Sequence, residues 1–193
     1  VSNDKGTSTP PEVAISRVVQ AMIYAVDNGA RVINASLGGD FPETPQSVLD
    51  MVEHIESHGV LLVCAAGNDG SNNDLINFIP AGIPSDHIIA VTSTNQRDEY
   101  YASHSYGPTT VDVAAPGYKI VSAMPNNQYA EKKGTSMATP HVTGLAALLF
   151  AQNPSRSATE VRQIIIDTVD PLPTLQGKIV SGGRVNAYSA LTY

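Results

Sequence analysis

Apolar residues recur along the chain with two different spacings. In residues 11–28 they lie three and four positions apart, which predicts an amphipathic helix. Thr9, followed by two prolines, is its start signal, and Gly29 is its stop signal. A second such helix is predicted from Thr44 to Gly59. The runs "RVINASL" and "VLLVCAA", which follow these helices, are apolar without alternation and therefore indicate strands buried on both faces.

The rest of the chain continues this alternation. Two more buried strands, a hairpin and three helices are predicted, with Ser157 and Glu160 forming a capping box. The alternation of helices with strands that are apolar throughout indicates an α/β fold, with a mostly parallel sheet and helices on both faces. The predicted segments are "HIIAVTS", "VDVAAPG", the hairpin "YKIVSAM"–"NQYAEKK", a helix from near Ser136, a helix from Ser157, and "GRVNAYSAL".

Composition narrows the possible functions only slightly. The 193 residues suit a single domain, and a 42% hydrophobic content is enough for a packed core. A net charge of −7 argues against nucleic acid as a partner. We expect no membrane span, because no apolar run is long enough, and no intrachain disulfide, because Cys64 is the only cysteine.

Two loops lie where a parallel sheet binds ligands, at the carboxyl ends of strands. They are "ASLGGD", residues 35–40, and "AAGNDG", residues 65–70. The second contains the side-chain amide of Asn68. Ser136 stands at a predicted helix start, where a backbone N–H is unpaired and the helix dipole is positive. A hydroxyl beside two N–H donors has the parts needed for acyl transfer.

Each feature taken alone also has a simpler interpretation. Ser136 could be a helix cap, Asn68 could belong to an Asn-Asp-Gly turn, and "SLGG" could be an ordinary loop. Their occurrence together, each at the end of a strand or the start of a helix, favours a nucleophilic serine.

These same segments resemble the motifs of the subtilisin-like serine proteases, the subtilases. "GTSMATPHVTGLAALL" is similar to their active-serine motif, "VINASLGG" to their substrate-strand motif, and "AAGND" to their oxyanion-asparagine motif. "ASHSYGPTTVDVAAPG" resembles the segment before the serine hairpin. The resemblance extends from about Pro11 to Leu191.

The resemblance implies a role for each matching residue. Ser136 would be the nucleophile of a serine endopeptidase, and Asn68 would stabilise the oxyanion together with the Ser136 N–H. Thr135 and Met137 are expected only to pack, and Phe78 would lie near the pocket floor, before a cis Ile79–Pro80 bond. Ser36, Leu37 and Gly38 would pair with a polypeptide substrate, while Ala65, Ala66 and Gly67 would line its side-chain pocket.

The resemblance also implies an aspartate and a histidine before the serine, and neither motif is found. His141 lies more than one helical turn beyond Ser136, and no "HGT" run occurs. We therefore expect residues 1–193 to form a single partial catalytic domain, incomplete because the N-terminal half is absent, and nearly inactive alone. A processed fragment, an engineered truncation and a natural pseudo-enzyme would each explain this. We expect the missing half or a second copy as partner, and a secretory location by resemblance.

Metal ligands are not expected in this chain. His54 and His58 have the spacing of metal ligands on a helix, but no third ligand accompanies them, which favours a solvated face. No cofactor is expected here, although the resemblance makes calcium possible in the full-length enzyme. Asp69, Asp74 and Asp86 are spread over loops, which leaves only a weak carbonyl site around Ala81 open.

Two other functions fit parts of the sequence. "GTSMA" approaches the nucleophile elbow of α/β-hydrolases, but Asp167 and Asp170 are not followed by the histidine that such enzymes need. A non-catalytic protein that binds peptides in the same loops is the second alternative.

Overall fold

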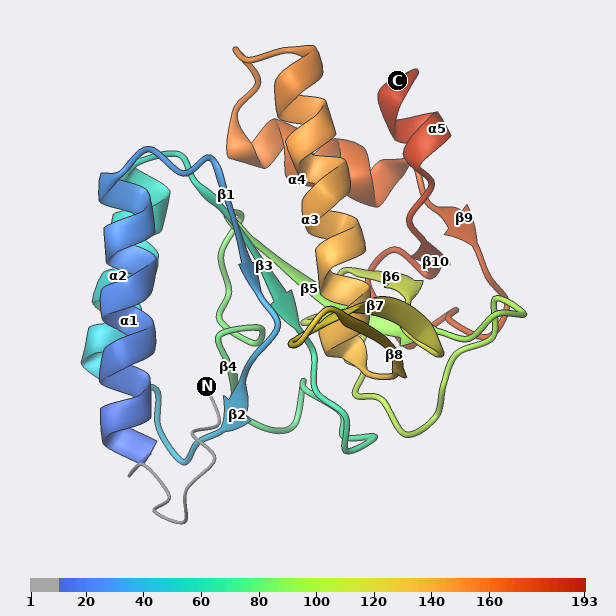
Figure 1. Cartoon of the computed structure of the whole chain (residues 1–193), viewed down its shortest axis with the longest axis horizontal. Coiled ribbons are helices and arrows are strands. Elements are labelled where there is room, and N and C mark those ends of the chain that lie inside the picture. Colours follow the sequence, from blue (N-terminus) through green and yellow to red (C-terminus); the bar gives the residue numbers. More distant parts are fainter. Residues whose placement is uncertain (1–10) are drawn as a thin grey trace.

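A six-stranded sheet lies at the centre of the computed structural model, which describes residues 11–193 (Figure 1). The strand order is β1-β3-β5-β6-β10-β9, and every neighbouring pair is parallel except β10 with β9. The mostly parallel sheet predicted from the apolar runs is thereby confirmed. Its strands are β1 (Val32–Ala35), β3 (Leu61–Ala65), β5 (Ile88–Thr94), β6 (Val113–Pro116), β9 (Asp170–Pro171) and β10 (Gly183–Arg184).

Helices cover both faces of this sheet, so the central strands are buried throughout. Leu62 and Cys64 belong to one apolar core and Leu61 and Val63 to another, because successive side chains of a strand point to opposite faces. The helices α1 (Pro11–Asp27) and α2 (Gln46–Ser57) pack in the first core, and α3 (Thr135–Gln152), α4 (Ala158–Asp167) and α5 (Ala187–Leu191) pack in the second.

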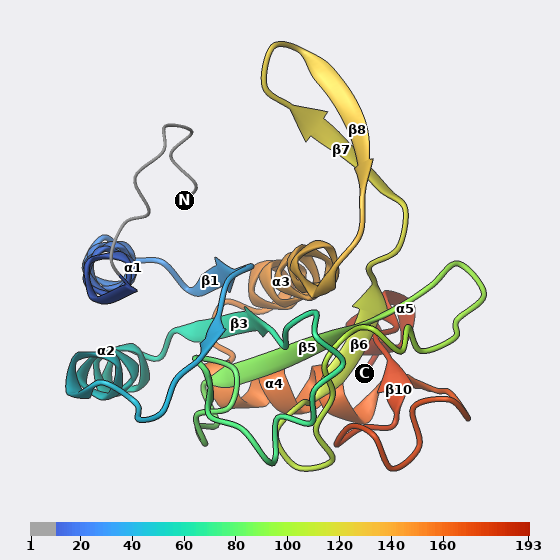
Figure 2. The same ribbon diagram turned by 90° about the horizontal axis from the view of Figure 1, so that it is seen from below.

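Two smaller pairs of strands lie outside the main sheet. β2 (Gly39–Asp40) pairs antiparallel with β4 (Phe78–Ile79), and the Ile79–Pro80 bond that follows is cis, as the resemblance implied. β7 (Ile120–Met124) and β8 (Gln128–Lys132) form the predicted hairpin, which projects from the body of the molecule (Figure 2).

The ends of the helices follow their sequence signals closely. Ser157 and Glu160 form the predicted capping box at the start of α4. Helix α3 begins at Thr135, with Gly134 as its N-cap residue, so Ser136 is the second residue of the helix. The predicted start signal at Thr9 lies outside the described residues. No helix within residues 11–193 has both the length and the apolar character needed to cross a membrane.

Candidate active site

Two strand-end loops meet at the first turn of α3. The segment after β1 and the first turn of α3 exchange a pair of hydrogen bonds. Ser36 Oγ donates to the carbonyl of Ser136 at 2.8 Å, and Ser136 Oγ donates to the carbonyl of Ser36 at 3.2 Å. The cap interpretation of Ser136 is therefore wrong, because its hydroxyl points across to the neighbouring strand instead of closing its own helix.

The turn that begins α3 depends on Gly134. Its φ of 144° lies in the region that side chains rarely adopt, and its N–H donates to the carbonyl of Gly117 at 2.8 Å. A Cβ atom here would also lie 3.2 Å from Oδ1 of Asn68. The glycine thus lets the helix start close to the loop that carries Asn68.

Thr135 connects the helix to the loop after β3, a role that the sequence did not indicate. Its Oγ1 is 3.2 Å from both the N–H and the carbonyl of Gly67, and its own N–H donates to Oδ1 of Asn68 at 2.9 Å. Because Thr135 is fully buried, the contacts of its hydroxyl with Gly67 are shielded from water. Thr135 therefore holds Asn68 in position, in addition to packing.

The contact with Thr135 also decides which end of the Asn68 amide is available. With Oδ1 accepting from a backbone N–H, the Nδ2 group is the end left to donate. The N–H of Ser136 has no hydrogen-bond partner within residues 11–193, since it lies in the first helical turn. Both donors belong to residues that line the same hollow.

That hollow contains most of the predicted substrate-binding residues. Ala66 is not among its lining residues, because its side chain is buried in the core and its carbonyl accepts from Asn73 Nδ2 at 2.8 Å. The predicted residues that do line the hollow are Ser36, Leu37, Gly38, Ala65, Gly67, Asn68 and Ser136, and Asp40, Asp69, Phe78 and Thr135 lie beside them.

Phe78 lies between the two glycines that the resemblance places in opposite walls. A Cβ atom on Gly38 would be 2.5 Å from Cε1 of the Phe78 ring, and one on Gly67 would be 3.1 Å from the same ring. Only glycine leaves room for the ring at these positions. Phe78 thus fills the space expected at the floor of a side-chain pocket.

None of the five histidines, all of which lie within the described residues, hydrogen-bonds to Ser136. His141 Nδ1 is bound to the carbonyl of Met137 at 2.9 Å. His104 is buried and paired with Ser93, and burial, followed by the charge of Lys133, lowers the pKa of its ring. Within residues 11–193, the hydroxyl of Ser136 is therefore bonded to the carbonyl of Ser36 and to no histidine.

Comparison with known proteins agrees with the motifs and with this geometry. The profile of the subtilase family matches residues 4–186. The chain belongs to the subtilase family. It is 44% identical over 179 residues to a thermophilic serine proteinase of Bacillus sp. (strain AK1) and 43% identical over 176 residues to thermitase of Thermoactinomyces vulgaris.

The subtilase chain matches only part of these relatives. It covers 42% of the Bacillus proteinase and 59% of thermitase, whereas 93% and 91% of its own length are matched. Its fold is also similar to that of solved proteases. The TM-score is 0.81 with the prenylagaramide maturation protease PagA, at 26% identity, with 98% of this chain and 70% of that chain covered. The TM-score with the self-cleaved protease domain of PatA is 0.78, at 30% identity, with 91% of this chain and 66% of that chain covered.

Proposed function

We propose that this chain is the part of a subtilisin-type serine endopeptidase that carries the nucleophile and the substrate-binding walls. Ser136 Oγ attacks the carbonyl carbon of a peptide bond, and the acyl group stays on the serine until water releases it. The Ser136 N–H and Asn68 Nδ2 stabilise the negative oxygen that forms. The observation that carries this proposal is one hollow lined by both Ser136 and Asn68, whose amide is fixed by Thr135.

The proposed substrate is an extended polypeptide. Ser36, Leu37 and Gly38 follow the end of β1 at the rim of the hollow, where a substrate backbone can add as a further strand. Ala65 and Gly67 form the other wall. Because the Phe78 ring occupies the floor, we expect small side chains to be accepted next to the cleaved bond.

The histidine and aspartate of the triad come from outside the described residues in this proposal. Two features of the fold support a segment that covers it. β1 ends the sheet order, and β3 is its only strand neighbour in the part of the chain that the structure describes. Helix α3 contains no Asp, Glu, Lys or Arg, yet Leu148 on it is 53% exposed. We propose that the segment bearing the family's aspartate and histidine motifs packs on this face.

A fluorophosphonate probe tests the proposal, because it labels only a serine that a base has activated. The chain alone is expected to remain unlabelled at Ser136, while the chain mixed with a polypeptide carrying the missing motifs is expected to become labelled. Ser136→Ala is the control for the site of labelling. If the mixture forms a complex and Ser136 still does not react, the proposed catalytic role is wrong.

Peptide binding without cleavage is the second candidate function. It is favoured by the hydrogen bond of Ser136 Oγ to the Ser36 carbonyl, which leaves the hydroxyl bonded to no histidine within residues 11–193. Calorimetry with extended peptides separates the two functions. Peptides that bind with equal affinity to the chain alone and to the labelling-competent mixture, without being cut, would support this function.

Two further expectations follow from family membership alone. We propose that the protein acts outside the cell or in the secretory pathway, which detection in culture supernatant but not in washed cells would support. We also propose that calcium, where it stabilises the complete enzyme, binds outside the hollow described above. A calcium-dependent rise in melting temperature that is retained in Asp69→Asn would agree with this.

A further inference from the structure

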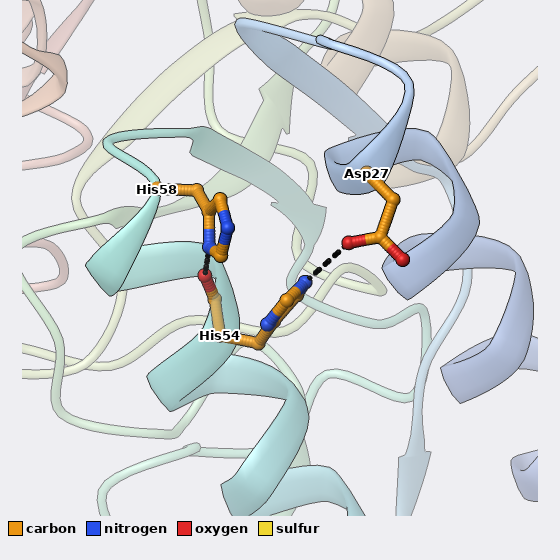
Figure 3. A group of neighbouring side chains, drawn as sticks. All are labelled: Asp27, His54 and His58. Carbon is orange, nitrogen blue, oxygen red and sulfur yellow. Dashed lines mark hydrogen bonds and ion pairs between the residues drawn. The ribbon is translucent and has the colours of Figure 1, made fainter.

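Three potential metal ligands lie together at the ends of α1 and α2, on residues that the sequence places far apart. Asp27 is the last residue of α1, His54 is in the last turn of α2, and His58 is its C-cap residue (Figure 3). One ligand atom from each residue lies within 4.8 Å of the other two. The sequence predicted that His54 and His58 form a solvated pair without a third ligand. The packing of α1 against α2 places Asp27 beside them.

The ring of His58 is oriented as metal-binding imidazoles usually are. Its Nδ1 lies 2.9 Å from the carbonyl of His54, to which Ser57 Oγ also donates its proton at 3.0 Å. A ring N–H on Nδ1 satisfies that carbonyl and leaves the lone pair on Nε2. A contact of one ring nitrogen with a backbone carbonyl commonly fixes the other nitrogen as a ligand.

His54 and Asp27 already face each other. His54 Nε2 is 2.8 Å from Oδ1 of Asp27, with 30% and 54% of the two side chains exposed. A tetrahedral zinc ion holds its nitrogen and oxygen ligands at about 2.0–2.2 Å, and thus roughly 3.3 Å from one another. Small side-chain rotations would open the pair enough for an ion to replace the shared proton, while that proton moves to His54 Nδ1.

The surroundings favour a cation. Asp27, His54 and His58 all lie at the carboxyl-terminal ends of their helices, where the unpaired carbonyl groups give a negative potential. Two imidazoles and one carboxylate suit zinc and its neighbours in the periodic table and not calcium, which prefers oxygen ligands alone.

We propose that Asp27, His54 and His58 bind a divalent transition-metal ion of the zinc class, with water completing its coordination, and that the ion ties α1 to α2. The C-terminal ends of α1 and α2 lead into the amino ends of β1 and β3 (Figure 1), whereas the hollow that Ser136 lines lies after the carboxyl ends of these strands. The role is therefore structural, and it does not depend on the proposed catalytic function.

Calorimetric titration of Zn²⁺ into the chelator-treated protein tests this site. A single Zn²⁺ is expected to bind per chain and to raise the melting temperature, with no competition from Ca²⁺. His58→Ala and Asp27→Asn should each weaken binding about tenfold or more, the loss that even an outer-sphere contact can cause. His141→Ala is the matched control, because His141 Nδ1 also lies 2.9 Å from the carbonyl four residues earlier but is not part of the cluster.

Cobalt provides a second readout that does not depend on stability. Co²⁺ bound by two imidazoles and a carboxylate absorbs visible light, and this absorption should disappear in His58→Ala while the circular dichroism stays unchanged. Equal Zn²⁺ affinity in the wild type and in Asp27→Asn, or no binding to the wild type at millimolar Zn²⁺, would overturn the proposal.

Discussion

Asn68 is held through its oxygen, and this contact determines what the residue can do. Its Oδ1 accepts the Thr135 N–H, so Nδ2 is the available donor beside Ser136. In the proposed endopeptidase this amide acts only when negative charge develops on the substrate oxygen. The hydrogen bond to Oδ1 therefore leaves Nδ2 as the atom with which Asn68 can donate to the substrate oxygen.

Asn68→Ala and Asn68→Asp are expected to lower kcat in the assembled enzyme with little change in KM. The loss for alanine should be about 10²–10³, the magnitude known for the corresponding amide of subtilisin itself. The aspartate variant keeps an acceptor for Thr135 but has no donor, so its melting temperature should stay close to that of the wild type. Full kcat in Asn68→Asp would exclude the oxyanion role.

Phe78 is expected to restrict which residue is accepted next to the cleaved bond. Phe78→Gly removes the ring that lies against Gly38 and Gly67, and should raise kcat/KM for substrates with large apolar side chains relative to alanine. A panel of peptides that differ only at that residue measures the ratio. An unchanged ratio would show that the substrate side chain lies elsewhere.

His104 should make stability depend on pH. Burial and Lys133 hold its pKa below the ordinary 6.5, so the folded state keeps the ring neutral while the unfolded chain gains a proton. The free energy of unfolding should therefore fall as the pH decreases from 6.5 toward the lowered pKa. Urea unfolding at about pH 7.5 and about pH 5.5 measures the difference. His104→Phe should reduce this difference, whereas His141→Ala should retain it.

At the scale of elements, an ion pair connects α4 to the sheet. Arg162 on α4 donates to Oδ1 of Asp112 at 2.7 Å and to the carbonyl of Ile88 at 2.9 Å. Asp112 also accepts the Ala90 N–H at 2.7 Å, and its side chain is only 7% exposed. Burial raises the pKa of Asp112 even though Arg162 opposes this shift. The ion pair of Arg162 with Asp112 therefore positions α4, and loss of either partner would leave the other charge without its counter-charge.

Arg162→Ala should destabilise the protein by about 3–5 kcal/mol, because it leaves the buried carboxylate without a counter-charge. Asp86→Asn is the matched control, since Asp86 is 84% exposed and lies 3.7 Å from the same guanidinium. That change should cost less than about 1 kcal/mol. Chemical unfolding of both variants provides the comparison, and equal losses would contradict the assigned role of Asp112.

At the scale of the whole molecule, residues 11–193 leave an apolar helix face and a sheet edge uncovered. Leu148 of α3 is exposed, and among the described strands β1 has a neighbour on one side only. Exposed edges and apolar patches favour pairing with another chain. The proposed complementary segment would remove both features at once.

The isolated chain is accordingly expected to self-associate, or to retain a bound partner segment. Light scattering over a range of concentrations should show a mass above that of one chain, and Leu148→Gln should lower it. A wild-type chain that remains a monomer at high concentration would contradict this expectation.

The sequence alone determined the family and the larger helices and strands, whereas it did not predict the two-residue strands β2, β4, β9 and β10. Apolar residues three and four positions apart predicted the helices, and continuous apolar runs predicted the strands, because burial of one helix face or of both strand faces depends on local spacing. The motifs around Ser36, Asn68 and Ser136 predicted the site for the same reason, since each is a contiguous string. The extent of the chain as one partial domain stays a prediction.

Only the tertiary structure decided how distant residues meet. Thr135 orients Asn68, Phe78 fills the gap between Gly38 and Gly67, and Asp27 joins His54 and His58. No spacing along the chain encodes such contacts, because they depend on how the helices and loops pack around the sheet. Packing also buried His104 and placed the Ser136 hydroxyl against the carbonyl of Ser36.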